Sequence, residues 1–262
     1  MELPDLEPLI RTAVAAADAA GSVIRPYFRA GLAADDKADD SPVTIADRNA
    51  EQAIRALIAA RHPDHGILGE EFGLDHPAAG LRWVLDPIDG TRAFITGRPI
   101  FGTLIALLAD GVPVLGLIDQ PITGERWIGV TGRPTTFRGP FGGAAGTRRC
   151  AGLAAAELSC TSTEMFEAAD LPAWSRLRAA TRRTTYGGDC YAYGLLALGQ
   201  IDVILESTMK VWDWAAIVPV ITGAGGSVTD WHGHPLTPDS TGHILALGDP
   251  SLLNAALTRL AA

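Results

Sequence analysis

The feature of this sequence that most constrains its fold is an apolar run at residues 81–85 that ends in two carboxylates three residues apart. The run predicts a buried strand, and the residues after it are Asp86-Pro87-Ile88-Asp89-Gly90-Thr91. Asp86 and Asp89 therefore leave the strand together, and Gly90 and Thr91 can open a helix whose free N–H groups suit a phosphate. Carboxylate and carbonyl oxygens are the ligands that Mg²⁺ prefers. One short stretch thus offers ligands for a metal and donors for a phosphate, as a metal-assisted phosphatase needs.

A turn without a metal is the alternative interpretation of the same stretch. Asp-Pro and Asp-Gly are turn dipeptides, and two carboxylates at the end of a strand can simply be solvated. A short motif is a hypothesis until its context agrees. The choice therefore depends on whether distant parts of the chain supply further ligands.

The composition narrows the class of protein. A chain of 262 residues can bury a large core, either as one domain or as two intimate ones. Hydrophobic residues make up 47% and charged residues 19%, which is typical of globular proteins. The formal charge of -9 argues against a nucleic-acid or anionic-membrane surface. Bound divalent cations would reverse the local sign at a site for phosphate.

Cysteine use and the chain ends indicate the compartment. The three cysteines form no C-x-x-C pair and are odd in number, which favours a reducing compartment over a disulfide scaffold: Cys150, Cys160 and Cys190. Residues 1–5 lack the basic and apolar regions of a signal peptide. The uncharged run 214–229 is broken by Pro219 and three glycines, so it predicts no membrane span. We expect a soluble, cytoplasmic protein.

Local patterns in the first half predict helices followed by strands. Apolar residues at helical spacing predict a helix over residues 6–30. Thr44 and Asp47 form an S/T-x-x-D capping box, which predicts a second helix over 44–61. A short strand at 67–69 then leads to a pair of glutamates. Two apolar strands around an Asp-Gly dipeptide form a predicted hairpin, and a third strand follows: 101–109, 112–119 and 125–130.

The second half alternates strands and helices, which is typical of an α/β arrangement. The Gly- and Arg-rich segment 131–149 is the best candidate for a boundary. We therefore expect an N-terminal α+β half over 1–140 and a C-terminal α/β half over 141–262. Beyond the boundary we expect strands at 158–160, 184–186 and 201–205, and helices at 190–198 and 214–223. The histidine pair in 229–236 is interpreted as part of a tight turn between strands.

Four carboxylates lie at the ends of predicted elements. Glu70 follows the strand at 67–69, Asp86 and Asp89 follow the strand at 81–85, and Asp213 opens a helix. Taken singly, Asp213 could be an ordinary helix cap and Glu70 part of a solvated loop. Together with the Gly-Thr pair they fit a phosphate site with several metal ions.

Three motifs in this order and spacing resemble the signatures of the inositol monophosphatase superfamily. They are Gly69-Glu70-Glu71, Asp86-Pro87-Ile88-Asp89-Gly90-Thr91 and Trp212-Asp213-Trp214-Ala215-Ala216. The resemblance extends from Lys37 to the C-terminal strands. It implies an α/β fold, a layered α/β/α/β/α sandwich of the inositol monophosphatase / fructose-1,6-bisphosphatase type, with the active site between the two halves.

Within the superfamily the chain is similar to the histidinol-phosphatase branch. The marks of that branch are Arg92-Ala93-Phe94-Ile95, the segment 97–103 and the segment 187–194. This similarity implies a Mg²⁺-dependent phosphomonoesterase that hydrolyses L-histidinol phosphate to L-histidinol and phosphate in histidine biosynthesis. The alternative is an inositol monophosphatase or another phosphatase of small phosphate esters. The expected partner is thus a small molecule, with no nucleic acid and no membrane, in a protein that the family resemblance implies to be a homodimer.

The resemblance also implies two to three Mg²⁺ ions. The first would be held by Glu70, Asp86 and the backbone carbonyl of Ile88. A second would be held by Asp86, Asp89 and Asp213, so that Asp86 bridges the two. A third, weaker ion would lie near Glu70, largely in water.

The catalytic residues implied by the family are Thr91, Asp47 and Glu70. Thr91, with Asp47 behind it, would orient the attacking water, while the N–H groups of Gly90 and Thr91 would bind phosphoryl oxygens. Asp47 has a competing interpretation as the acidic member of the capping box. Lys37 is likewise either a solvated lysine or a contact to the metal region.

Asp189 and Glu206 fall where the family contacts the non-phosphate part of the substrate, beside the substrate-binding residues Gly90, Thr91, Arg92 and Asp213. Histidinol phosphate carries an ammonium group, which a carboxylate can bind by charge-assisted hydrogen bonds. A neutral polyol would suit Glu206 equally well, so Asp189 discriminates better. Arg92 is left with two interpretations, an ion pair within the chain or a contact to substrate from a neighbouring subunit.

Overall fold

The computed structural model describes residues 5–30 and 42–261. Lys37 lies outside the described residues. Among the helices that are described, none is both long and apolar enough to cross a membrane.

The first two helices pack side by side. Helix α1 (Leu6–Ile24) begins at Asp5, whose side chain accepts the N–H of Glu7, and runs into the 3₁₀ turn η1 (Arg25–Tyr27). Helix α2 (Pro42–Arg61) ends where the sequence predicts, but it begins earlier than Thr44. A proline suits the first turn of a helix because the N–H it lacks would have no partner there. The predicted capping box was therefore wrong, and Asp47 lies inside the helix.

The first sheet has seven strands in the order β2-β1-β3-β4-β5-β6-β7. The strands are β1 (Gly66–Gly69), β2 (Gly73–Asp75), β3 (Leu81–Asp89), β4 (Gly102–Ala109), β5 (Val112–Gln120), β6 (Glu125–Val130) and β7 (Thr136–Arg138). Only β1 and β3 pair in parallel. The predicted hairpin is confirmed, and its turn has positive φ at both Asp110 (47°) and Gly111 (82°), as a two-residue hairpin requires.

Strand β3 is longer than the apolar run that predicts it. It continues to Asp89, and its register against β4 shifts between Asp86 and Asp89, so that Asp86 faces Leu104 and Asp89 faces Gly102. Three residues of β3 thus span two of β4, which is a bulge. The hydroxyl of Thr103 holds it by donating to the Pro87 carbonyl at 2.8 Å.

The second sheet has five strands in the order β11-β12-β10-β8-β9. They are β8 (Glu157–Cys160), β9 (Arg183–Tyr186), β10 (Val203–Glu206), β11 (Ser227–Thr229) and β12 (Ile244–Leu247). The first three agree with the predicted strands and run parallel. The expected turn between strands at His232-Gly233-His234 is confirmed, with φ of 86° at Gly233, and the strands on either side of it are β11 and β12, whose ranges were not predicted.

The remaining helices are α3 (Thr91–Ile95), α4 (Leu171–Ala180), α5 (Asp189–Ala197), α6 (Val211–Trp214), α7 (Ile217–Gly223) and α8 (Leu253–Ala261). The single helix predicted over 214–223 is in fact two helices, since the helical structure is interrupted between Trp214 and Ile217. Helix α8 was not predicted.

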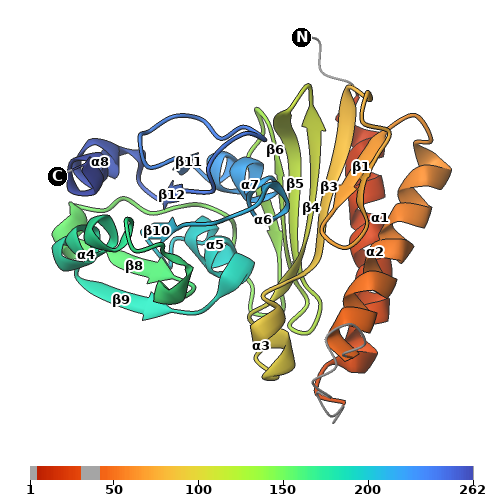
Figure 1. The fold of residues 1–262 in the computed structure, drawn as a ribbon, viewed down its shortest axis with the longest axis horizontal. Coiled ribbons are helices and arrows are strands. Elements are labelled where there is room, and N and C mark those ends of the chain that lie inside the picture. The colour runs from red at the N-terminus through yellow and green to blue at the C-terminus, as the bar shows by residue number, and fades with distance from the viewer. Residues whose placement is uncertain (1–4, 31–41, 262) are drawn as a thin grey trace.

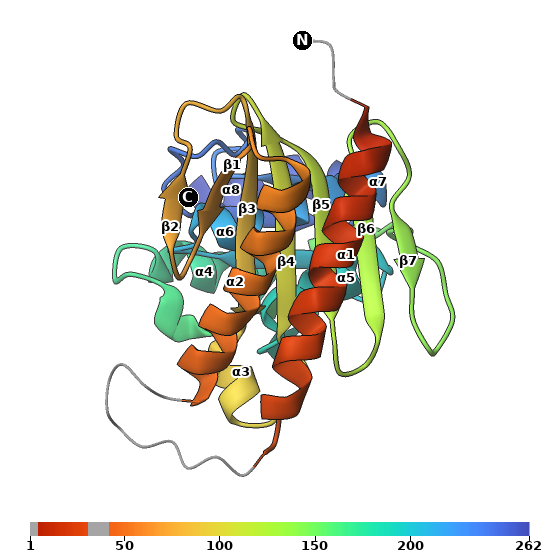
Figure 2. The same ribbon diagram turned by 90° about the vertical axis from the view of Figure 1, so that its right-hand side faces the viewer.

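These elements stack in five layers (Figure 1). Helices α1 and α2 cover one face of the seven-stranded sheet, as Figure 2 shows. Helices α5, α6 and α7 lie between the two sheets, and α4 and α8 cover the far face of the five-stranded sheet. The expected layered α/β/α/β/α sandwich is confirmed, with an apolar core in each of the gaps between sheet and helices.

Glycines bring the first sheet close to α7. A Cβ at Gly116 in β5 would overlap the carbonyl oxygen of Ala216, and a Cβ at Gly129 in β6 would overlap the backbone of Pro219. The backbone of α7 therefore rests directly on the sheet. This close approach joins the layer that carries Asp86 to the layer that carries Asp213.

We predict that Gly116→Ala lowers the free energy of unfolding by about 2 kcal/mol or more, because an added methyl group has no space between β5 and α7. The measurement is urea unfolding of the purified protein. The matched control is Gly146→Ala, since a Cβ at Gly146 would meet nothing within 4 Å. Equal stability of the two variants would contradict the close packing.

Candidate functional site

Three predicted carboxylates meet between the two halves of the molecule. One side-chain oxygen each from Asp86, Asp89 and Asp213 lies within 4.8 Å of the others. The first two come from the bulged end of β3, and Asp213 comes from α6, which packs against β3 and β4. Residues more than a hundred positions apart in the sequence thus form one acidic cluster.

Asp213 is a helix cap and also a member of the acidic cluster. It lies in the first turn of α6, where its Oδ2 accepts the backbone N–H of Lys210 at 2.6 Å. This hydrogen bond caps the helix. The same carboxylate supplies an oxygen to the acidic cluster, so the cap fixes the direction of a candidate ligand.

Backbone groups also orient the other two aspartates. Asp86 Oδ1 accepts the N–H of Ile88 at 3.1 Å. Asp89 Oδ2 accepts the N–H of Cys190 at 2.5 Å, which ties the end of β3 to the start of α5. Each carboxylate therefore keeps at least one oxygen that these contacts do not use.

Glu70 lies beside this cluster, at the end of β1. Its N–H donates to the Leu85 carbonyl at 3.2 Å, which continues the parallel pairing of β1 with β3. Burial raises the pKa of Glu70, and the neighbouring Glu71 and Glu51 carboxylates raise it further, while a hydrogen bond with Asp86 lowers it. The structure therefore brings all four predicted carboxylates together.

The carboxylates of the cluster are buried close together. Burial raises the pKa of both Asp86 and Asp89 well above the usual range, and neighbouring carboxylates raise it further. Burial likewise raises the pKa of Asp213 to about 7. The ion pairs found among the described residues involve none of these three aspartates and not Glu70.

These carboxylates fit a hard divalent cation. Buried charges are paired in folded proteins or they bind metal ions, and oxygen ligands are those that Mg²⁺ and similar cations take. A cation among Asp86, Asp89, Asp213 and Glu70 would supply the missing positive charge and lower the pKa of each ligand.

Asp47 lies behind the cluster on α2. Burial and the negative charges of Glu71, Glu70 and Glu51 raise the pKa of Asp47 to about 8, while a hydrogen bond from the Ile88 backbone lowers it. Among the described residues its Oδ1 is buried with no hydrogen-bond partner. The Thr91 hydroxyl also reaches Ile88, donating to its carbonyl at 3.4 Å. Asp47 and Thr91 thus both hydrogen-bond to the backbone of Ile88.

The predicted helix after Gly90 is present as α3. Gly90 is its N-cap, with φ of 90°, and the N–H groups of the first turn lack intrahelical partners. A Cβ at Gly90 would lie 2.8 Å from the Asp189 carboxylate. Glycine is therefore required there by both the left-handed backbone and the close approach of α5.

A cavity of about 170 Å³ opens beside the acidic cluster. Its lining includes Asp89 and Asp213 of the cluster together with Thr161, Met165, Asp189, Tyr193, Glu206 and Met209. Both predicted substrate carboxylates therefore share one space with two of the predicted metal ligands. The cavity is small and its titratable lining is acidic.

Asp189 and Glu206 differ in how far their oxygens are occupied. Glu206 accepts hydrogen bonds from the N–H and the hydroxyl of Thr161, at 2.9 and 2.5 Å, and from the Tyr193 hydroxyl at 2.9 Å. Burial raises the pKa of Asp189 to about 6, although Arg98 and Arg92 lower it. Asp189 is also held at φ of 43°, a left-handed conformation that aspartate tolerates better than most residues.

Arg92 makes an ion pair within the chain. Its Nη1 lies 3.1 Å from Glu164 Oε2, between α3 and the 3₁₀ turn η3 (Thr163–Met165). Both side chains are largely exposed. The first of its two interpretations is thus observed, and a contact to substrate stays a prediction.

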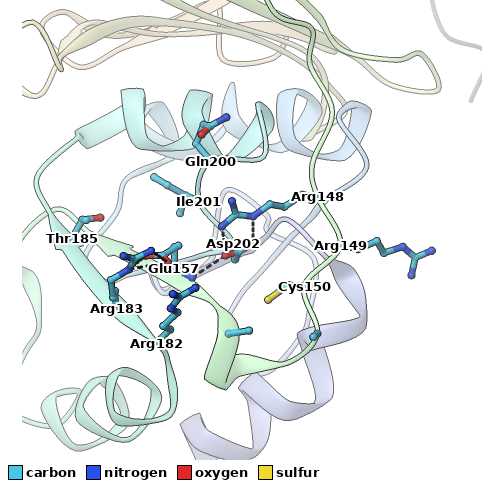
Figure 3. Close-up of a pocket in the computed structure, with 12 residues that line it drawn as sticks. Arg148, Arg149, Cys150, Glu157, Arg182, Arg183, Thr185, Gln200, Ile201 and Asp202 are labelled. Atoms are coloured by element: carbon cyan, nitrogen blue, oxygen red, sulfur yellow. Dashed lines mark hydrogen bonds and ion pairs between the residues drawn. The ribbon is translucent and has the colours of Figure 1, made fainter.

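A larger cavity, of about 510 Å³, lies at the N-terminal ends of β8 and β10, away from the acidic cluster (Figure 3). Its carboxylates are already paired, Glu157 with Arg183 at 2.6 Å and Asp202 with Arg148 at 2.7 Å. No unpaired acidic cluster faces this space among the described lining residues. Size alone therefore does not identify the functional site.

Sequence reasoning missed Glu51, which is fully buried beside the Glu70 loop. It lies four residues after Asp47 on α2, so both carboxylates face the sheet from one side of the helix. The sequence does contain a signal for Glu51. It is an acidic pair at helical spacing, on the helix face that also carries Ile54 and Ile58.

The raised carboxyl pKa values predict that the stability of the protein depends on pH. They also predict that a bound cation removes this dependence. Because the folded pKa values of Asp47 (about 8), Asp213 (about 7) and Asp189 (about 6) exceed the ordinary value of 3.8, folding binds protons. In a chelator, stability should therefore fall as the pH rises from about 4 to about 8. Adding Mg²⁺ should raise the unfolding temperature most at the upper end. Unfolding temperatures that change equally with pH in chelator and in Mg²⁺ would contradict this.

Comparison with known proteins agrees with the geometry. The sequence model of the inositol monophosphatase family matches residues 5–261. The chain is 48% identical to the bifunctional phosphatase IMPL2 of Arabidopsis thaliana, over 94% of this chain and 73% of that protein. It is 37% identical to the histidinol-phosphatase of Chlorobaculum parvum, over 92% of this chain and 93% of that protein.

A solved structure has the same fold. An inositol monophosphatase from Zymomonas mobilis superposes with a TM-score of 0.92 at 49% identity, over 99% of this chain and all of that one. The match of the family model across nearly the whole chain, with the acidic cluster at the predicted motifs, shows that this chain belongs to the inositol monophosphatase family.

Proposed function

We propose that this phosphatase is a Mg²⁺-dependent histidinol-phosphatase, which hydrolyses L-histidinol phosphate to L-histidinol and phosphate. The observation that carries the proposal is the cavity in which the Asp189 carboxylate lies beside the candidate metal ligands Asp89 and Asp213. The name of one relative supports the substrate, since the protein of Chlorobaculum parvum is a histidinol-phosphatase.

The proposed metal ligands are Glu70, Asp86, the Ile88 carbonyl, Asp89 and Asp213, enough for two to three Mg²⁺ ions. Bound divalent ions would lower the pKa of a water molecule and neutralise charge on the phosphoryl and leaving oxygens. This chemistry accounts for the concentration of acidic ligands in a protein that binds an anionic ester.

The chain itself would position the reacting groups. Thr91 and Asp47 both hydrogen-bond to the backbone of Ile88 and would orient the attacking water. The N–H groups of Gly90 and Thr91, at the start of α3, would donate to phosphoryl oxygens. Water attacks phosphorus in line with the leaving alkoxide, so no covalent phosphoenzyme is needed.

We propose Asp189 as the contact for the substrate ammonium group. Among the described residues no hydrogen bond occupies its carboxylate, whereas Glu206 already accepts three. Arg92 and Arg98 lower the pKa of Asp189 and so favour its charged form. Glu206 would act mainly by shaping the cavity through Thr161 and Tyr193, and any direct contact would use its remaining lone pairs.

An inositol phosphate is the second candidate substrate. The observation in its favour is the fold shared at 49% identity with a protein named an inositol monophosphatase. A polyol carries no positive charge, so it would leave the Asp189 carboxylate without an ionic partner in a small cavity. This difference in charge separates the two candidates.

We also retain two structural proposals from the sequence. The division at residues 140 and 141 is supported by the two sheets, because the first ends at Arg138 and the second begins at Glu157. A homodimer is proposed from family membership, with its mass in solution as the test.

The test of the function is phosphate release from L-histidinol phosphate, inositol 1-phosphate, fructose 1,6-bisphosphate and 3′-phosphoadenosine 5′-phosphate, each with Mg²⁺ and with EDTA. We expect a Mg²⁺-dependent preference for histidinol phosphate. Asp89→Asn should cut turnover by about 100-fold or more, because it removes one anionic ligand. The exposed Asp239→Asn is the control and should match the wild type. Preference for another ester would reject the substrate, and full activity of Asp89→Asn would reject the ligand set.

Asp189→Asn tests the substrate contact. Asparagine tolerates the left-handed backbone, so the variant changes charge with little change in conformation. We expect kcat/KM for histidinol phosphate to fall about 10- to 100-fold, as loss of a hydrogen bond to a charged group implies. Hydrolysis of p-nitrophenyl phosphate should change less than about threefold, since it has no ammonium group. Equal losses on both esters would contradict the assignment.

A further inference from the structure

The loop that carries Glu70 is held by a buried glutamate of α2. Glu51 has no exposed surface, and its Oε2 accepts the N–H of Glu71 at 2.9 Å. Its Oε1 accepts the N–H of Phe72 at 3.3 Å. The backbone on the C-terminal side of Glu70 is therefore fixed to α2 by a carboxylate that is not itself in the metal cluster.

Gly69 lets this loop lie directly on the Glu51 carboxylate. A Cβ at Gly69 would overlap all three atoms of that group. The residues before and after Glu70 are thus both in contact with Glu51, and the Glu70 side chain projects from a backbone held on each side.

Arg55 lies one helical turn after Glu51 on α2 and helps to hold the same loop. We call Glu51 and Arg55 together the clamp. Its Nε donates to Glu51 Oε1 at 2.7 Å, which balances the buried charge. Its other nitrogens reach strand β2, with Nη2 donating to the Gly73 carbonyl at 2.5 Å and Nη1 pairing with Asp75 at 2.7 Å. One guanidinium therefore joins α2, Glu51 and the strand that follows the Glu70 loop.

The clamp fixes a candidate ligand within the crowded acidic cluster. Glu70 is hydrogen-bonded to Asp86 and lies on the short connection between β1 and β2. The hydrogen bonds that Glu51 accepts from the neighbouring backbone N–H groups hold this connection in place without adding a ligand. A ligand that is already in place binds a cation more tightly than one that must be ordered.

We propose that the Glu51–Arg55 pair is a positioning device that sets the divalent-cation affinity of the site by holding the Glu70 loop. The inference rests on the proposed metal-dependent function and names residues beyond its ligand set. Glu51 is a positioning residue, because it touches the loop backbone and not the cluster.

Glu51→Gln is the test, because an amide has nearly the same shape but only one acceptor oxygen. It cannot accept from two loop N–H groups and from Arg55 together. We expect Mn²⁺ affinity, measured on the substrate-free protein by the electron paramagnetic resonance signal of the free ion, to weaken about 10-fold or more. The Mg²⁺ concentration for half-maximal activity should rise by the same factor. At saturating Mg²⁺, kcat and substrate KM should return to within about threefold of wild type.

A matched control is Glu157→Gln, which breaks the same kind of pair, with Arg183, at the far end of the second sheet. It should leave Mn²⁺ affinity unchanged. Arg55→Lys provides a second variant that keeps the charge but loses the planar fork, and it should weaken Mn²⁺ binding to a smaller extent. If the pair acts as a unit, the variant that carries both substitutions should bind Mn²⁺ no more weakly than Glu51→Gln by itself.

The outcomes separate the inference from the function on which it rests. A wild-type protein that binds no Mn²⁺ would overturn both. Wild-type Mn²⁺ binding with unchanged affinity in a folded Glu51→Gln variant would overturn the clamp only. If Glu51→Gln shows no cooperative unfolding, Arg55→Lys decides, and unchanged affinity in that variant overturns the proposal. A fall in kcat that saturating Mg²⁺ does not restore would also reject it, since positioning through the cation predicts recovery.

Discussion

The repulsion among buried carboxylates is the interaction on which the rest of this structure depends. Asp86, Asp89 and Asp213 bring oxygens within 4.8 Å of one another, and none has an ion pair among the described residues. Such an arrangement is costly in a protein interior unless cations or protons balance it. The surrounding fold must therefore supply the stability that the site lacks. Three apolar cores and the close contact of α7 with the first sheet provide it.

Backbone N–H groups hold this repelling set in place. Ile88 donates to Asp86, Cys190 to Asp89 and Lys210 to Asp213, and each donor comes from a different part of the chain. Because these donors carry no formal charge, they orient the carboxylates without neutralising them. A lysine or arginine in the same places would lower the pKa values but would also compete with a metal ion for the oxygens. The site thus keeps its affinity for cations by using dipoles instead of charges.

The sequence predicted the parts of this site that depend on local patterns. The apolar run before Asp86, the helix after Gly90 and the hairpin at Asp110 all follow from short-range signals, and all are present. The bulge of β3 did not follow, because it depends on pairing with β4. The capping box failed because Pro42 already starts α2. Glu51 was missed because its function lies in contacts with residues twenty positions away, which no local pattern records.

Charge also gives a reason why an acidic cavity can select among phosphate esters. The cluster at one end of the cavity would be balanced by metal ions, and these would meet the phosphate. Asp189 lines the same cavity close to Asp89, and among the described residues it makes no ion pair. A substrate with a phosphate at one end and an ammonium group at the other complements both. A neutral alcohol would cover the Asp189 carboxylate without compensating its charge, and this difference in charge is the physical basis of the proposed preference.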